Sequence, residues 1–155
     1  MHAEESALWS LDRKDGMEKA YCCFNSNARD FARFGQLLLN NGQWDDRQLI
    51  SPAYLAEATS PDTRLVYKDL GKPNHCYGFQ YWILDYKGMK IPYMRGILGQ
   101  YVFTLPEKNA VIVRLGHKRS DTYTADQHYP DDINTWLDAA MDFTSNKIYL
   151  STNLK

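Results

Sequence analysis

The chain has 155 residues, the length of a single domain. Its composition, with 44% hydrophobic and 24% charged residues, excludes an intrinsically disordered chain. The 18 Lys and Arg residues nearly balance the 19 Asp and Glu residues, so the net charge of −1 supplies no field that would hold a polyanion. The densest basic cluster is short and lies beside Asp121, and we therefore expect no nucleic-acid partner. This cluster consists of Arg114, His117, Lys118 and Arg119.

The lengths of the apolar runs and the number of cysteines further limit the class of protein. Runs such as residues 110–113 fall far short of the roughly 18 residues that a membrane helix requires, so no membrane span is predicted. Three cysteines are too few for a disulfide framework. Because adjacent cysteines rarely pair with each other, Cys22 and Cys23 are expected to be buried free thiols. No pair of His or Cys residues has the spacing of a zinc site, and the sequence predicts no metal and no cofactor.

The N-terminal part predicts one long helix after a polar segment. Residues 1–19 lack a clear period and are expected to form an irregular lead-in that packs through Trp9. A helix is predicted over residues 28–41, with Asn27 as its N-cap and Asp30 placed to return a hydrogen bond to the cap. Its apolar side chains fall on one face, which consists of Phe31, Phe34 and Leu38.

A second start signal follows in the chain. Ser51 is a suitable cap, and Pro52 occupies the first helical position, where its missing N–H is not needed. This helix ends before Pro61, and residues 62–76 are expected to form a loop.

Strands dominate the next part of the chain. Residues rich in aromatic and β-branched side chains predict strands over 77–84, 90–95, 101–105 and 110–115. Pro92 restricts the second of these to an edge or a bulge. The last two are joined by a four-residue turn that begins at Pro106. Residues 110–113 show no polar alternation and are expected to be buried on both faces.

A last helix is predicted to open at Pro130. Its buried stripe consists of Ile133, Trp136, Leu137, Ala140 and Met141. The order of elements is helix, helix, four strands, helix. It predicts an α+β fold with an antiparallel sheet of about four strands flanked by helices.

One short stretch stands out as a candidate binding segment: Arg95, Gly96, Ile97, Leu98, Gly99 and Gln100. Two glycines three residues apart at the entrance to a strand let the backbone approach a ligand closely. Backbone N–H groups exposed there could stabilise an oxyanion. The alternative is a bulge that only turns the strand.

Five segments, in the same order along the chain, resemble the serine β-lactamase family, especially its class C and esterase-like branch and the penicillin-binding-protein-like enzymes. Residues 101–116 resemble the paired strands near the C-terminus of that family. The other segments are residues 27–42, residues 48–52, residues 77–82 and the closing helix with Trp136. Together they span about residues 20–145, which leaves residues 146–155 as a tail.

The resemblance implies that residues 20–145 are the C-terminal part of a β-lactamase-like domain. The parent enzyme would hydrolyse a small-molecule amide or ester through an acyl-serine. The family's Ser-x-x-Lys and Tyr-x-Asn motifs do not occur in this sequence, so no catalytic residue is assigned and the chain alone is expected to be inactive.

For the candidate segment, the resemblance implies that the backbone of residues 96–100 binds substrate and supplies one oxyanion donor. The Lys or His of the family's third motif is missing there. Arg95 either anchors a substrate carboxylate as a bidentate donor or pairs with a structural acid.

Further expectations concern the class of protein and its partners. A non-catalytic α+β binding domain is the alternative function, because residues 77–103 are rich in aromatic side chains. A fragment that lacks the family's N-terminal strands would have an unpaired sheet edge, which favours self-association at micromolar concentration. The resemblance suggests an extracytoplasmic, periplasmic bacterial parent, while the compartment of this chain itself stays unknown.

Overall fold

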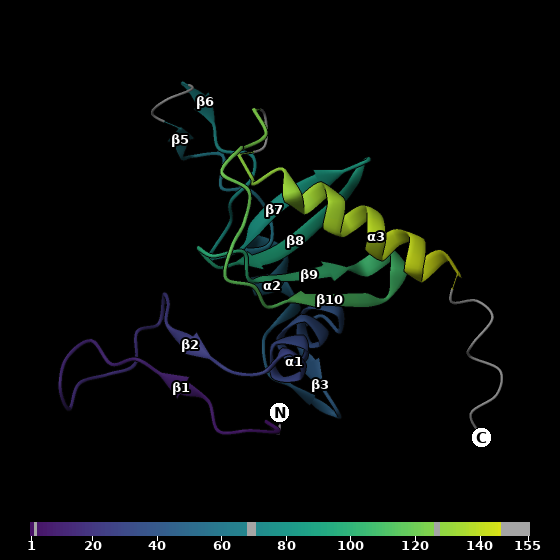
Figure 1. The fold of residues 1–155 in the computed structure, drawn as a ribbon. Coiled ribbons are helices and arrows are strands. Elements are labelled where there is room, and N and C mark those ends of the chain that lie inside the picture. Colours follow the sequence, from purple (N-terminus) through teal and green to yellow (C-terminus); the bar gives the residue numbers. More distant parts are fainter. Residues whose placement is uncertain (2, 68–70, 126–127, 147–155) are drawn as a thin grey trace, which may run out of the picture.

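A computed structural model of the chain describes residues 1, 3–67, 71–125 and 128–146. These residues form an α+β fold of three helices and a four-stranded antiparallel sheet (Figure 1), as predicted. The helices are α1 (Ala28–Leu39), α2 (Pro52–Ala58) and α3 (Asp132–Asn146). The strands of the sheet, in spatial order, are β10 (Ala110–Arg114), β9 (Tyr101–Leu105), β8 (Met89–Arg95) and β7 (Trp82–Tyr86). Short pairs join β1 (Leu8–Trp9) to β2 (Phe24–Asn25), β3 (Gln43–Trp44) to β4 (Arg47–Gln48), and β5 (Val66–Tyr67) to β6 (Lys72–Pro73).

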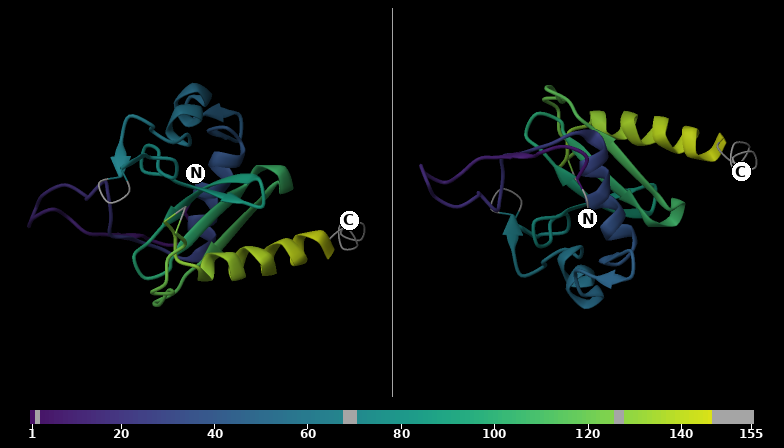
Figure 2. Two further views of the ribbon diagram at one scale, coloured as in Figure 1. Left: turned by 90° about the horizontal axis from the view of Figure 1, so that it is seen from above. Right: turned by 90° about the horizontal axis from the view of Figure 1, so that it is seen from below.

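The sheet lies between α1 and α3 (Figure 2). Side chains alternate along β9, so every second residue enters the core beneath α3 and the others face α1. With a helix on each side, β9 is buried at every position. The core beneath α3 consists of Leu84, Tyr86, Ile91, Tyr93, Tyr101, Phe103, Leu105, Tyr129, Ile133 and Leu137.

Helix α1 begins where the sequence predicts, because the Asn27 side chain accepts the N–H of Asp30. Phe31 and Phe34 lie on one face of α1, as predicted, because both contact the ring of Phe24. Gly35 packs against Val102 and Val111 of the sheet, Leu37 is also buried, and Phe34 is exposed. The aromatic residues turn instead toward the N-terminal segment, where Phe24 meets the rings of Phe31 and Phe34 edge-on. A helix packed between two partners has two apolar faces, and a single stripe does not describe it.

The buried carboxylate of Asp30 ties the N-terminal segment to α1. Asp30 does not return a hydrogen bond to the cap; it accepts the N–H groups of Glu4 at 2.8 Å and Glu5 at 3.3 Å and the Ser26 hydroxyl at 3.0 Å. It also forms an ion pair with Arg33. The hydrogen bond from Glu4 is the largest cause that lowers the pKa of Asp30 below its ordinary value of 3.8.

We therefore expect the contact of Glu4 and Glu5 with α1 to break in strong acid. Because the folded pKa of Asp30 is lowered, its contribution to stability is present above pH 3.8 and is lost as the pH falls through the lower folded pKa. Asp30→Asn should loosen the segment already at neutral pH and abolish the acid step. The amide NMR signals of Glu4 and Glu5, followed from pH 6 to pH 2, measure this release. A midpoint at or above 3.8 would contradict the prediction.

Two strand predictions are wrong because each strand occupies a different position in the sheet from the one expected. Pro92 lies in β8, an interior strand, and not at an edge. The pairing of β8 with β9 includes only Tyr93 to Arg95, so the missing N–H of Pro92 falls outside that ladder. Residues 110–113 are not buried on both faces; β10 is an edge strand, half-buried along its length. The predicted turn between β9 and β10 is confirmed, as a short 3-10 helix (Pro106–Lys108).

The remaining helices follow the sequence signals with one exception. The Ser51 side chain caps α2 by accepting the N–H of Tyr54, as predicted. In α3, Trp136 is 43% exposed and not part of a buried stripe. Its ring lies 4.6 Å from the guanidinium of Arg114, and its indole N–H donates to Asp132. None of the helices in the described ranges is long and apolar enough to cross a membrane.

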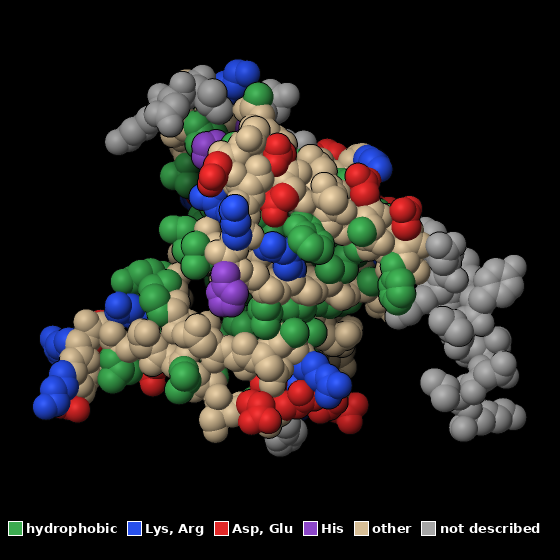
Figure 3. Space-filling view, viewed as in Figure 1, with side chains coloured by type: hydrophobic (Ala, Val, Ile, Leu, Met, Phe, Trp, Pro, Cys, Tyr) green, Lys and Arg blue, Asp and Glu red, His purple; other side chains and the backbone are tan. Residues whose placement is uncertain are grey.

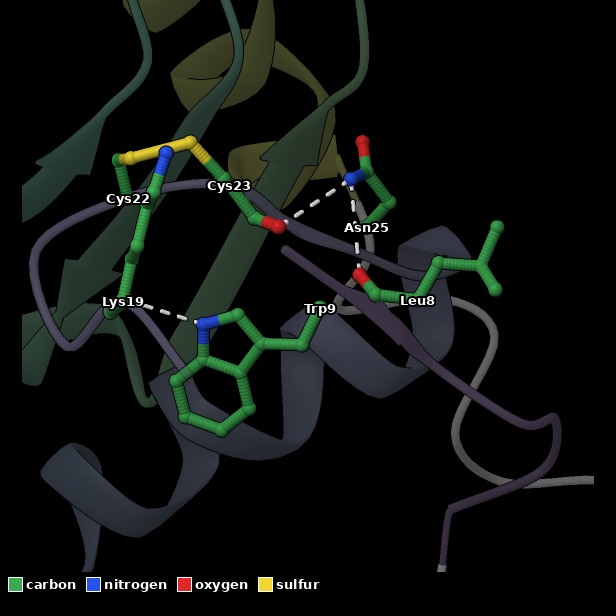
Figure 4. Close-up of a disulfide and its surroundings, with 6 residues drawn as sticks. All are labelled: Leu8, Trp9, Lys19, Cys22, Cys23 and Asn25. Atoms are coloured by element: carbon green, nitrogen blue, oxygen red, sulfur yellow. Dashed lines mark hydrogen bonds between the residues drawn. A yellow bond between two sulfur atoms is a disulfide. The ribbon is translucent and has the colours of Figure 1, made fainter. Parts of the chain in front are cut away.

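Residues 8–25 form an arm that projects from the body of the molecule (Figures 1 and 2). Strand β1 lies within residues 1–19, the segment predicted to be irregular, and it pairs with β2. The prediction of buried free thiols at Cys22 and Cys23 is wrong, because the two form a disulfide and Cys23 is exposed (Figure 4). Adjacent side chains diverge in an extended strand, but Cys23 has a φ of 70°, and this left-handed conformation allows the two sulfurs to meet. Cys76 is a free, buried thiol.

Candidate functional site

The candidate segment, residues 95–100, forms a tight connection from β8 to β9. The N–H of Gly96 donates to the carbonyl of Gln100 at 2.8 Å, and the N–H of Gly99 donates to the carbonyl of Gly96 at 3.3 Å. The N–H of Leu98 donates to the Gln100 side chain at 3.2 Å. Gly99 has a φ of 85°, a left-handed conformation that would strain another residue. The structure therefore brings these residues together in one closed loop.

These contacts decide which amide of the loop faces outward. The amides of Gly96, Leu98 and Gly99 all donate within the loop. In a trans peptide unit the carbonyl and the following N–H point in opposite directions. Because the carbonyl of Gly96 points into the loop, the N–H of Ile97 points out of it. Ile97 is also 81% exposed, so its outward amide is a candidate donor for a developing negative charge.

Side chains from the end of β10 and from the segment after it hold the loop by its main chain. Arg114 donates to the carbonyl of Gly99, and Nε of Arg119 donates to the carbonyl of Ile97 at 3.0 Å. The Gln100 side chain donates in turn to the carbonyl of Gly116 at 2.6 Å. These contacts fix the loop against the rest of the protein without using its side chains at positions 97 and 98.

The guanidinium of Arg95 lies against an aromatic ring. Its central carbon is 3.4 Å from the ring centroid of Trp82, a cation–π contact. Nη1 donates to the carbonyl of His128 at 3.0 Å and lies 3.5 Å from the Tyr93 hydroxyl. Among the residues that the structure describes, no ion pair joins Arg95 to a carboxylate. A guanidinium has five N–H donors, and these two contacts use only Nη1.

Beside Arg95 lies a hollow of about 220 Å³. It is lined by Trp82, Arg95, Gly96, Ile97, Arg119 and Tyr123. Two cations, two aromatic rings and an outward amide form a surface suited to an anionic group on a short apolar chain. Burial raises the pKa of Tyr93 and raises that of Tyr101 to about 12, so neither phenol offsets the positive charge at neutral pH.

A wider hollow of about 650 Å³ lies between the segment after β10 and the start of α3. It combines the cations Arg114, Lys118 and Arg119 with the carboxylates Asp131 and Asp132. Because both signs of charge line it, it favours neither anions nor cations. Figure 3 shows the same mixture of basic and acidic side chains across this face of the molecule.

The pair of nucleophilic groups near Arg95 is unsuited to catalysis. The hydroxyl of Tyr67 lies 2.6 Å from the thiol of Cys76, which is 1% exposed. Burial raises the pKa of both groups, so both stay protonated and neither becomes a nucleophile at neutral pH. In the described part of the chain, no group of three or more His, Cys, Asp or Glu side chains could hold a metal ion.

Sequence reasoning found the loop but not the side chains around it. Trp82 and Tyr123 lie 41 positions apart in the chain and meet Arg95 only in the folded protein. Arg114 and Arg119 stood out only as part of a basic cluster weighed for nucleic-acid binding. The signal for Trp82 was the aromatic richness of residues 77–103, and no signal in the sequence linked the arginines to the loop.

No protein-family model and no curated protein matches the sequence. Fourteen chains of solved structure match it in fold. One of them is described as a putative 6-aminohexanoate-dimer hydrolase from Bacillus anthracis, and it is similar to this chain with a TM-score of 0.68 and 25% sequence identity. The match covers 93% of this chain and 34% of the solved chain, so this chain spans about a third of that protein's length. The solved chain belongs to the β-lactamase-like hydrolases, and the similarity supports a fold of that type here.

Proposed function

We propose that this chain is the C-terminal part of a β-lactamase-related serine hydrolase that cleaves an amide or an ester. The observation that carries the proposal is the match of 93% of this chain to one third of a 6-aminohexanoate-dimer hydrolase. In this proposal the chain supplies one wall of the substrate cleft, and the serine and its base come from the remaining part of the parent. Without them, the chain alone does not hydrolyse substrate.

The loop of residues 95–100 is the substrate-binding edge in this proposal. Its outward Ile97 amide is one donor of the oxyanion hole, and Arg95 binds the carboxylate end of the substrate above Trp82. The hollow beside Arg95 accepts an apolar chain of the 6-aminohexanoate type. A linear amide with a terminal carboxylate is therefore the substrate class that we propose.

Two measurements on the purified chain test the proposal. Nitrocefin and p-nitrophenyl acetate should show no hydrolysis above the buffer rate. In NMR titrations, 6-aminohexanoate should shift the signals of Trp82 and of the loop amides, while 6-aminohexanamide, which lacks the carboxylate, should not. Arg95→Met should weaken this binding about tenfold, the effect of losing one charge-assisted hydrogen bond.

A matched variant separates charge from packing. Lys90→Met removes a cation at the far end of the same strand and should leave the binding unchanged, because Lys90 pairs with Asp85. Hydrolysis by the chain that survives the loss of Arg95 and of both loop glycines would overturn the fragment proposal. Equal binding of the ligands with and without the carboxylate would overturn the role of Arg95.

A non-catalytic binding domain is the second candidate function. The observation that favours it is the hollow itself, which combines two arginines with two aromatic rings. Binding of the carboxylate ligand together with restored hydrolysis, once the missing part of the parent is added, supports the hydrolase. Tight binding with no hydrolysis in the complete parent protein supports the binding domain.

The outer edge of β10 gives a prediction about association. In the described sheet, β10 pairs only with β9, so its other edge offers unpaired backbone groups. We expect dimers or larger species at micromolar concentration. Val113→Lys should shift the chain toward the monomer, because a charge on an edge strand opposes strand addition. Light scattering measures the mass, and a clean monomer at high concentration would contradict the prediction.

A further inference from the structure

The arm carries a disulfide between neighbouring residues, Cys22 and Cys23, whose Cα atoms are 3.8 Å apart. Cys23 is exposed and Cys22 is half-buried. We propose that this pair is a thiol–disulfide exchange site whose redox state controls how the arm packs on α1. The substrate of the exchange is a dithiol reductant, either a small molecule or the paired cysteines of a reducing protein.

The exchange proceeds at the exposed sulfur. A thiolate of the reductant attacks Sγ of Cys23, the bond to Sγ of Cys22 breaks, and Cys22 leaves as a thiolate that takes up a proton. The second thiol of the reductant then attacks the mixed disulfide and releases the Cys23 thiol. The protein disulfide gains two electrons and two protons, and the reductant becomes a disulfide. The side chain of Lys19 points toward the sulfurs (Figure 4), where its positive charge attracts an incoming thiolate.

Cys76, the remaining cysteine, cannot substitute for this pair. It is buried against Tyr67, so a reagent in solution does not reach it in the folded protein. Cys76 and the Cys22–Cys23 pair therefore differ in accessibility, so an alkylating reagent can distinguish them.

Contacts around Cys23 connect the disulfide to the packing of the arm. Its left-handed φ of 70° is unfavourable for a residue other than glycine. In this conformation its carbonyl accepts the N–H of Ser10 at 3.1 Å and Nδ2 of Asn25 at 3.4 Å, the second of which is drawn in Figure 4. The next residue is Phe24, whose ring packs edge-on against Trp9.

Phe24 is also the residue through which the arm contacts α1. Its ring centroid lies 5.6 Å from that of Phe31 and 5.8 Å from that of Phe34. Once the disulfide is reduced, nothing covalent holds Cys23 in the left-handed conformation. The residue then relaxes, its carbonyl turns away from Ser10, and Phe24 moves with it. Reduction therefore loosens the arm from α1.

Alkylation of the folded chain tests the exchange itself. The chain has three cysteines, of which two form the disulfide and one is buried. Intact mass after native iodoacetamide treatment should show no label on the chain isolated without reductant. After millimolar dithiothreitol it should show two labels, at Cys22 and Cys23. Two labels before reduction, or none after it, would overturn the proposal.

A pair of variants tests the link to the arm. Cys22→Ala with Cys23→Ala removes the disulfide and keeps the strain, so amides of residues 8–25 should exchange hydrogen about tenfold faster than in the oxidised chain. Cys22→Ala with Cys23→Gly removes the disulfide but accepts a positive φ, so its exchange should stay close to that of the oxidised chain. Equal exchange in both variants, or no change in the wild-type chain on reduction, would overturn the control of packing.

Discussion

Replacing Gly78 with alanine is expected to lower the free energy of unfolding by about 3 kcal/mol or more. Gly78 is buried where the chain passes the end of α2. A Cβ at this position would lie 2.6 Å from the carbonyl oxygen of Ser60 and nearer still to that of Ala58. Both obstacles are backbone atoms, so no side chain can rotate away. The amide of Phe79 donates to Ala58 at 2.9 Å, and relief of the clash would break this bond.

A matched glycine separates this clash from the general effect of adding a side chain. Gly88 lies in the turn between β7 and β8 and has a φ of 85°, and a methyl group added to it would meet no atom within 4 Å. Gly88→Ala should therefore lose only about 1 kcal/mol, through backbone conformation alone. Urea unfolding of both variants measures the difference. A loss at Gly78 no larger than that at Gly88 would show that the two segments do not approach as closely as the structure has them.

Phe103→Ala is expected to remove about 3–5 kcal/mol from the free energy of unfolding. The Phe103 side chain is 0% exposed and lies at the centre of the core beneath α3. Its ring stacks on Tyr93 at 5.3 Å and lies 5.4 Å from the ring of Tyr101. Truncation leaves a cavity between two strands, and the flanking tyrosines are too confined to fill it.

Conservative and surface variants complete this experiment. Phe103→Leu keeps most of the volume and should lose about 1.5 kcal/mol. Met17→Ala changes an exposed side chain on the arm and should stay within about 0.5 kcal/mol of the wild type. Thermal and urea unfolding give both values. A loss for Phe103→Ala below that of Phe103→Leu would contradict the placement of Phe103 at the centre of the core.

The sequence predicted those elements that depend only on residues close together in the chain. Asn27 and Ser51 both cap helices, because a side-chain oxygen beside free N–H groups acts the same way in any fold. The turn that starts at Pro106 likewise depends on four consecutive residues. The positions of strands in the sheet depend instead on which strands pair. Pro92 lies inside the sheet and β10 lies at its edge for this reason. The sequence of one strand does not encode its neighbours.

At residues 95–100, the special backbone conformation was predictable from the sequence, and the neighbouring side chains were not. The two glycines predicted either a close approach to a ligand or a bulge that turns the strand, and the structure forms a closed loop at Gly96 and Gly99. For Arg95 the sequence left two partners open, a substrate carboxylate and a structural acid. Its observed neighbour is the ring of Trp82, 13 residues earlier in the chain and across a strand pair. Cation–π contacts of this kind leave no spacing pattern that sequence inspection can detect.

The way Arg114 and Arg119 hold the loop has a consequence for its evolution. Both donate to main-chain carbonyl oxygens, which every amino acid has, and neither forms a hydrogen bond with the side chain of Ile97 or Leu98. Residues 97 and 98 can therefore mutate freely while the curve of the polypeptide stays constant. Related proteins can therefore evolve different ligand specificities at this loop while its backbone conformation is conserved.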